Sequence, residues 1–202
     1  MPNILALILF PIYPFLSFLI ACTNLRNRAN GFVFVLFYAL FGYCHTFADM
    51  RTDAFRKAAD FRSHFSEPFS ETISRFADGE IMDVYESMLF SVMRSFTDNP
   101  SIMMMVVGFI VGFFVLKVLQ RVLSDYPYRA NIVVYALAFM VFLSLSPVHL
   151  GGVRNITALS IFIYSTIRFL VDKRSIWIIG VLITPFIHFS YIVCAVVVII
   201  IR

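Results

Sequence analysis

The sequence is poor in charge and in cysteine, and it lacks the short motifs that mark soluble catalytic domains. Only 14% of its 202 residues are charged, whereas 60% are hydrophobic, and the mean hydropathy is +0.87. This composition excludes a water-soluble fold. The absence of a Gly-rich phosphate loop, a nucleophile elbow and an HExxH motif excludes the common soluble kinase and hydrolase chemistries. The three cysteines have no metal-ligand spacing and predict neither a disulfide framework nor a zinc site.

Basic residues are also missing ahead of the first apolar stretch, where a secretory signal would carry them. We therefore expect that stretch to be retained as a membrane span. The net charge of +4 requires no nucleic-acid partner, because basic residues of membrane proteins collect in cytoplasmic loops.

Long apolar runs are what the sequence has in abundance. A bilayer core about 30 Å thick is crossed by roughly 20 residues of helix, and six runs approach that length. They cover residues 4–22, 31–47, 102–119, 132–145, 156–171 and 175–201. Pro185 interrupts the last run, so we expect a break near residues 185–190 and two helical pieces around it. The predicted fold is an all-α, polytopic membrane helical bundle of about six to seven membrane segments, forming a single membrane domain over residues 1–202.

The connectors after the first, third and fifth runs set the predicted orientation. With the adjoining span ends they carry eight basic residues against two acidic ones, Asp125 and Asp172. The basic residues are Arg26, Arg28, Lys117, Arg121, Arg129, Arg168, Lys173 and Arg174. The positive-inside rule therefore places these connectors in the cytoplasm and the N-terminus outside.

Residues 48–100, on the predicted outer side, hold ten acidic and six basic residues. Residues recur there at helical spacing in three stripes, which are apolar or aromatic except for Arg62. The stripes are Phe55, Ala58, Ala59 and Arg62, then Phe65, Phe69, Ile73 and Phe76, then Ile81, Tyr85, Met88, Val92 and Phe96. We expect an extracytoplasmic insertion of two or three amphipathic helices along the membrane surface. It would form either a roof over a lipid-embedded site or a cap that merely packs on the bundle.

Two ionisable residues near membrane depth are candidates for chemistry. Arg154 follows paired glycines at the expected start of a helix, where its guanidinium and the helix dipole would together bind an anion such as a pyrophosphate. A snorkelling arginine that binds lipid headgroups is the alternative. His188 follows the Pro185 break and could accept a proton from a sugar hydroxyl. Its alternative is a histidine that bonds a carbonyl group freed by the proline.

Three charged residues open the outer segment. Asp49 and Asp53 would share one helix face, with Arg51 between them. Paired carboxylates can supply a general base or position a hydroxyl group, but charge clusters on surface helices are usually solvated. Binding of substrate and simple solvation both remain open for this cluster.

The order of four motifs resembles the EpsG-type, Wzy-like polysaccharide polymerases. The motifs are ADMRTDAFRKAADF, DVYESMLFSVMRSFTDNP, SPVHLGGVRNITALSIFIYSTIRFLVDKR and PFIHFSYIV. The matching positions are Asp53, the stop at 97–100, the Gly-Val-Arg at 152–154 and the Ile-His-Phe-Ser at 187–190. Ser146 departs from the family pattern, in which Asn precedes the proline. The family also usually continues with further membrane helices, so we expect the 202 residues to be an N-terminal portion.

The resemblance implies a multi-pass enzyme of the bacterial inner membrane that moves a glycan from one polyprenyl-pyrophosphate carrier onto another lipid-linked repeat. It implies no cofactor, no metal and no nucleotide sugar. On this analogy Arg154 holds the pyrophosphate leaving group and His188 assists near the acceptor hydroxyl. Asp49, Arg51, Asp53, Asn155 and Ser190 are the candidate substrate-binding residues. The expected partners are the lipid-linked oligosaccharide, membrane lipids, a flippase and a chain-length regulator.

A non-enzymatic component or a transporter of a polysaccharide export system is the competing hypothesis. A transporter should carry charged residues at the bilayer midplane and symmetric broken helices. Few charges fall at that depth in this sequence, which favours the enzyme or a passive binding role over ion-coupled transport.

Overall fold

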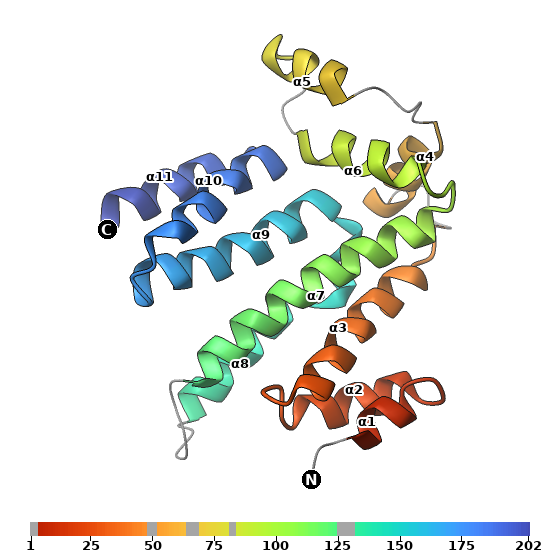
Figure 1. Cartoon of the computed structure of the whole chain (residues 1–202), viewed down its shortest axis with the longest axis vertical. Helices are drawn as coiled ribbons and strands as arrows, with labels where there is room; N and C mark the ends of the chain where they lie inside the picture. Colours follow the sequence, from red (N-terminus) through yellow and green to blue (C-terminus); the bar gives the residue numbers. More distant parts are fainter. Residues whose placement is uncertain (1–3, 48–51, 64–68, 81–83, 125–131) are drawn as a thin grey trace.

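The computed structural model describes residues 4–47, 52–63, 69–80, 84–124 and 132–202, and these residues form eleven α-helices and no strand (Figure 1). The helices are α1 (Ile4–Leu9), α2 (Pro14–Cys22), α3 (Arg28–Tyr43), α4 (Asp53–Ser63), α5 (Phe69–Ala77), α6 (Val84–Arg94), α7 (Pro100–Ser124), α8 (Ile132–Ser144), α9 (Val153–Thr166), α10 (Ile178–Ile187) and α11 (Tyr191–Ile201). Two short 3-10 helices, η1 (Pro147–Gly151) and η3 (Ser175–Trp177), and one π-helical turn, η2 (Ile167–Val171), complete them. The predicted all-α class is confirmed for the described residues.

The centre of the fold is the antiparallel pair of α3 and α7, which lie side by side in Figure 1. Glycines let the two backbones approach closely. A Cβ atom added at Gly42 would lie 2.2 Å from the Met104 carbonyl oxygen, and one at Gly108 would lie 2.3 Å from the Tyr38 carbonyl oxygen. The fully buried Tyr38 also donates a hydrogen bond to the Leu145 carbonyl at 3.0 Å. Glycines at this seam therefore bring the two backbones together, while large side chains such as Phe34, Met103 and Met104 form the buried core around it.

Only α7, among the described helices, is long and apolar enough to cross a membrane. Its 25 residues include the predicted span 102–119, and more than half of its most apolar stretch is buried inside the protein. The other apolar helices are shorter, for example the 16 residues of α3 and the 13 of α8. A bundle of six to seven spans therefore stays a prediction.

The predicted single span over residues 4–22 is wrong, because two short helices replace it. Pro11 lies in the turn between them and has no N–H with which to continue α1, while Pro14 begins α2. The Ser17 hydroxyl donates back to the Ala6 carbonyl, so α1 and α2 pack against each other. The predicted outside location of the N-terminus assumed one continuous first span, and it stays a prediction.

The predicted break in the last apolar run is confirmed. Helix α10 ends at Ile187, His188 is extended with φ −150°, and α11 begins at Tyr191. The chain then returns along α10, since the Arg202 guanidinium donates to the Ser175 hydroxyl at 3.0 Å and lies 4.0 Å from the centre of the Phe169 ring. The end of α11 thus lies beside η2 and η3, the two short helices that precede α10.

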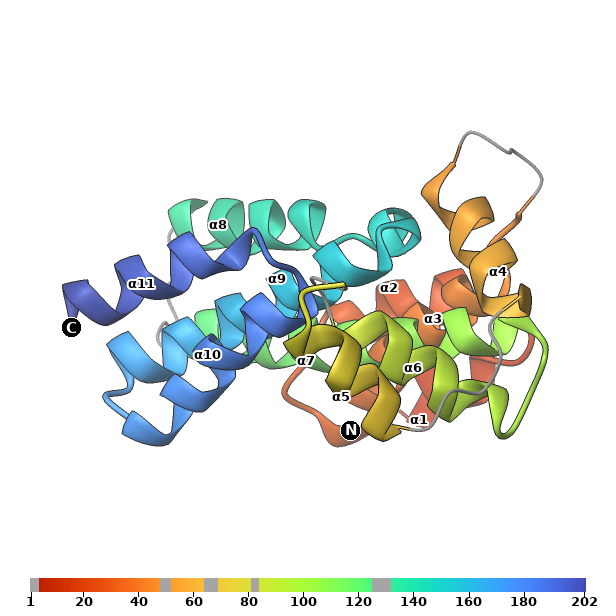
Figure 2. The same ribbon diagram turned by 90° about the horizontal axis from the view of Figure 1, so that it is seen from above.

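Helices α4, α5 and α6 are the three helices of the predicted insertion, and they lie across one end of α7 and α9 (Figure 2). The buried faces differ from the predicted stripes. Helix α4 buries Ala54, Ala58 and Phe61 in place of the face with Phe55 and Ala59. In α6 part of the predicted stripe is exposed, with Met88 at 38% and Val92 at 56%, whereas Tyr85 is half-buried. The buried residues of this helix are Val84, Leu89, Phe90 and Met93. Periodicity located these helices but did not identify which side faces the protein.

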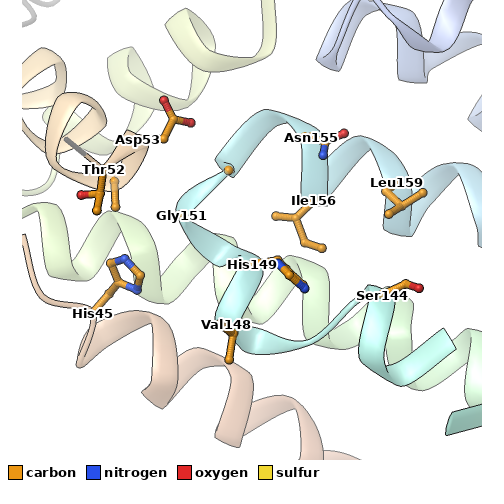
Figure 3. A pocket seen from close by; sticks show the side chains of 12 residues that line it. His45, Thr52, Asp53, Ser144, Val148, His149, Gly151, Asn155, Ile156 and Leu159 are labelled. Atoms are coloured by element: carbon orange, nitrogen blue, oxygen red, sulfur yellow. The ribbon is translucent and has the colours of Figure 1, made fainter. Parts of the chain in front are cut away.

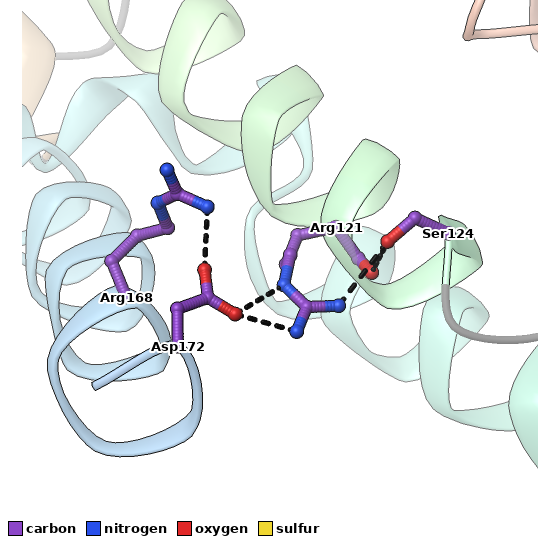
Figure 4. Close-up of polar contacts among 4 residues, drawn as sticks. All are labelled: Arg121, Ser124, Arg168 and Asp172. Atoms are coloured by element: carbon purple, nitrogen blue, oxygen red, sulfur yellow. Dashed lines mark hydrogen bonds and ion pairs between the residues drawn. The ribbon is translucent and has the colours of Figure 1, made fainter. Parts of the chain in front are cut away.

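The described residues of the predicted basic connectors lie at the end of α7 opposite to these three helices, whereas Arg129 and Asp125 lie outside the described residues. Arg26 donates to the Leu123 carbonyl at 2.6 Å, and Arg121 donates to Asp172 at 2.5 Å from Nη2 and 2.7 Å from Nε. Asp172 also receives a hydrogen bond from Arg168 (Figure 4). This carboxylate therefore joins α7 to the end of the α9–η2 helix.

Acid should weaken this junction. The hydrogen bonds from Arg121, then those from Arg168, hold the pKa of Asp172 below its usual value. A lowered folded-state pKa stabilises the fold at pH values above the unfolded pKa of about 3.9, and that stability is lost as pH falls through the lower folded pKa. We expect Asp172→Asn to lower the thermal midpoint of detergent-purified protein at pH 7, with the difference from wild type shrinking below about pH 4. A difference that is unchanged at pH 3 would show that the ion pairs do not carry the effect.

Candidate functional site

A polar pocket of about 600 Å³ lies where η1 meets α9 and the start of α4 (Figure 3). Its polar side chains are His45, Thr52, Asp53, Ser144, His149 and Asn155. They come from three separate parts of the chain, and two imidazoles, a carboxylate and an amide share one cavity. In the described structure, these side chains, which can bind hydroxyl groups and phosphate, lie together at the start of α9.

The sequence builds the wall of this pocket from a short 3-10 turn. The Ser146 hydroxyl accepts from the backbone N–H of Val148 at 3.4 Å and Pro147 starts η1, which then ends at the paired glycines. Gly152 has φ −83°, so the turn does not require a left-handed glycine. A Cβ atom at Gly151 would make ordinary contacts, 3.5 Å from the Ala54 Cβ and 3.8 Å from His45 Nε2, so close packing does not require glycine there either.

Arg154 is the second residue of α9, as predicted, but it lines the other side of the helix from the pocket. Its Nε lies 3.1 Å from one carboxylate oxygen of Glu86, and the Lys57 ammonium lies 2.5 Å from the other. The Lys57 and Glu86 side chains are each only 12% exposed, whereas Arg154 is 38% exposed. This three-residue network joins α4, α6 and α9 and holds Arg154 at the edge of the insertion.

The two predicted motifs around Arg154 and His188 are brought together by Tyr191. Its hydroxyl donates to the Asn155 side-chain oxygen at 3.2 Å, and its ring centre lies 6.0 Å from that of His188. The Ser190 hydroxyl lies 2.9 Å from His188 Nδ1, so the predicted pair His188 and Ser190 is in hydrogen-bond contact. The imidazole therefore bonds a neighbouring hydroxyl in place of the freed carbonyl considered from the sequence.

Asp53 begins α4 and lines the pocket, where it also forms an exposed ion pair with Arg56 at 3.5 Å. Asp49 and Arg51 lie outside the described residues. Of the seven predicted site residues, the pocket thus contains Asp53 and Asn155, with Arg154 beside Asn155 and His188 linked to it through Tyr191.

Sequence reasoning missed His149, Lys57 and Glu86. His149 lies between Pro147 and the paired glycines, in the same motif as Arg154. Its place in that motif could have identified it as a candidate site residue. Lys57 and Glu86 gave none, because charges on amphipathic helices are normally solvated. Tyr85, beside Glu86, bonds the Thr157 hydroxyl at 3.4 Å, and burial raises its pKa, so its hydroxyl is protonated at neutral pH.

Glu86 should be important for stability. We expect Glu86→Gln to destabilise the fold by about 2 kcal/mol, because it removes the carboxylate charge that pairs with the largely buried Lys57 and the partly exposed Arg154. Thermal unfolding of detergent-purified protein measures the loss. The matched control is Glu80→Gln, whose partner Arg75 is bound at 3.1 Å but whose side chain is 61% exposed; it should change stability by less than about 0.5 kcal/mol. Equal losses in the two variants would mean that the network adds nothing beyond a surface ion pair.

Comparison with known proteins adds a family match. The model of the EpsG family matches residues 60–202, which is more than two thirds of the chain. It covers η1, α9, α10 and α11, and it begins after the pocket residues His45, Thr52 and Asp53. Neither a curated protein nor a solved structure matches the sequence.

Proposed function

The chain belongs to the EpsG family, and from that premise we propose that it joins polyprenyl-pyrophosphate-linked glycan repeats at the outer face of the bacterial inner membrane. Membership indicates a polymerase-like role in polysaccharide biosynthesis at a membrane. The observation that supports the finer proposal is the polar pocket at the N-terminal end of α9, with an arginine held by Glu86 on the other side of the same helix end.

The pyrophosphate of the donor lipid would bind at the N-terminus of α9. Gly152 caps this helix without a side chain, so no cap side chain bonds the amides of its first turn. The amides of a helix N-terminus and the positive end of the helix dipole favour an anion. Arg154, on the first turn of α9, adds its guanidinium to this anion site. The ion pair with Glu86 holds that guanidinium in place before a substrate binds.

The proposed reaction is one substitution at the anomeric carbon of the donor sugar. The acceptor hydroxyl oxygen bonds to that carbon, the bond from the carbon to the phosphate oxygen breaks, and the pyrophosphate leaves with the electron pair. Arg154 stabilises the negative charge that develops there. The hydroxyl proton passes through the Ser190 hydroxyl to His188 Nδ1, which lies 2.9 Å from that hydroxyl and accepts from the Ser190 backbone N–H at 3.4 Å. Asp53 and Asn155 bind sugar hydroxyls. Asp49 and Arg51, which lie outside the described residues, stay candidates for the same role.

An apolar groove offers a place for the polyprenyl chain. It holds about 340 Å³ between α5, α6 and α10, and all its lining residues are apolar or aromatic. Tyr85 and Met88 of α6 line it opposite Ile183 and Phe186 of α10. The next residue after Tyr85 is Glu86, which binds Arg154. A chain in this groove would therefore bring its pyrophosphate close to the start of α9.

Deletion of the gene tests the proposal. We expect the host to lose long surface glycan, to accumulate single lipid-linked repeats, and to recover the polymer ladder when the wild-type full reading frame is supplied. The measurement is a gel of surface and lipid-linked glycans. An unchanged ladder after deletion would rule out the polymerase assignment and favour a non-enzymatic component of the export system.

A further inference from the structure

A second, cationic pocket lies at the opposite end of the α3–α7 pair. It has a volume of about 240 Å³, and its charged residues are Arg26, Arg28 and Lys117. None of the described residues that line it is acidic. The neighbouring carboxylate, Asp172, is engaged by Arg121 and Arg168. The three cations therefore face this pocket without a carboxylate among its walls.

Local hydrogen bonds build the polar end of the pocket. Arg26 donates to the Leu123 carbonyl at 2.6 Å, and Gln120 donates to the Leu25 carbonyl at 2.7 Å, so the loop before α3 is tied to the last turns of α7. The Lys117 ammonium lies 5.5 Å from the centre of the Phe113 ring. These contacts set the side chains around one opening.

The other end of the pocket is apolar and runs along the two helices toward the middle of α7. Phe32, Phe109 and Phe113 line it, and they are 52%, 46% and 42% exposed. Lys117 and Phe109 are two helical turns apart, about 12 Å. Gly31 keeps the floor open, because even a Cβ atom there would lie 3.1 Å from Leu116.

We propose that this pocket binds one anionic phospholipid of the surrounding membrane leaflet. Arg26, Arg28 and Lys117 contact the phosphate headgroup, and one acyl chain lies over Phe32, Phe109 and Phe113. A soluble anion would use only the cationic end and would leave the aromatic half empty. A lipid would fill both ends. Its headgroup would lie at the cationic end, and its acyl chain would lie on the aromatic surface that extends toward the centre of α7. The proposal does not depend on the polymerase reaction.

Lipid retention by the purified full chain tests the proposal. The protein is equilibrated in mixed micelles that contain phosphatidylglycerol and phosphatidylcholine, and retained lipid is identified by native mass spectrometry. We expect wild type to retain phosphatidylglycerol preferentially, and Arg28→Gln with Lys117→Gln to lower that preference about 30-fold, since each basic residue near the membrane surface contributes about a factor of five. The matched control is Lys173→Gln with Arg174→Gln, which removes the same charge from the same end of the molecule but outside the pocket.

Further experiments identify the molecule that occupies the pocket. Phe109→Ala should weaken retention of the lipid while leaving the preference for the anionic headgroup, and millimolar inorganic phosphate should not displace the lipid. If the double variant does not fold, Lys117→Gln alone should lower the preference about fivefold. Equal retention of both lipids by wild type, or the same loss in the control as in the pocket variant, would overturn the proposal. Displacement by inorganic phosphate would do the same, because it would identify a simple anion site.

Discussion

Arg154→Ala is expected to abolish the polymer ladder and leave single repeats, which corresponds to a loss of polymer of about 100-fold or more. Removing one preorganised donor from a developing negative charge costs on that order, and Arg154 is fixed at the positive end of α9 by Glu86 at 3.1 Å. The measurement is the glycan gel of a deletion strain that carries the variant, with an immunoblot for protein level. Arg154→Lys should give partial activity, because an ammonium keeps the charge but loses the planar fork.

Arg75→Ala is the matched control for that experiment. Arg75 has the same side-chain exposure of 38% and the same 3.1 Å contact to a glutamate, Glu80, but it lies on α5 away from the polar pocket. It should restore the full ladder. A well-expressed Arg154→Ala protein that restores the ladder equally would remove Arg154 from the reaction. Equal loss of polymer in Arg154→Ala and Glu86→Gln, in proportion to lost thermal stability, would instead reduce Arg154 to a structural ion-pair partner.

Gly108→Val is expected to have the largest effect on folding. A Cβ atom at this position would lie 2.3 Å from the Tyr38 carbonyl oxygen and 2.9 Å from its carbon, and these are backbone atoms in the middle of α3. The helices must separate to accommodate the side chain, which should cost more than about 3 kcal/mol. We expect the variant to aggregate or to elute as a broad peak in size-exclusion chromatography in detergent, and Gly108→Ala to show a clearly lowered thermal midpoint.

Ala136→Val on α8 is the control, because it places a β-branched side chain at an exposed position of another apolar helix. It should elute as a single peak with a midpoint close to that of wild type. A monodisperse Gly108→Val protein with an unchanged midpoint would show that the α3–α7 seam can separate without loss of the fold.

The predictions from sequence succeeded where a local signal was enough. Apolar runs located α3, α7 and α8, and Pro185 located the end of α10. They failed where a prolonged apolar run concealed a turn. Pro11 and Pro14 interrupt the first run as Pro185 interrupts the last, but composition alone suggested one span. Proline was therefore present in both runs, but only Pro185 was interpreted as the end of a helix.

The candidate site shows the same division between local and distant information. The motif around Arg154 identified the start of α9, and Asp53 and Asn155 line the pocket there. The partner of Arg154 was not foreseeable, because Glu86 lies 68 positions earlier on a helix whose charged residues resemble a solvated face. Contact between two such residues depends on how α6 crosses α9 and not on the sequence near either one.

The sequence by itself determined the membrane character, the all-helical class and the approximate places of α3, α7, α8 and the break after α10, because hydropathy and proline act within a few residues. Only the tertiary structure decided which helix faces are buried, which ion pairs form and where the two pockets lie. Those features depend on the close approach of α3 and α7 at their glycines and on the way α4 and α6 meet α9. Van der Waals contact and ion pairing act over a few ångströms in space, and residues distant in the chain come within that range only when the helices have packed.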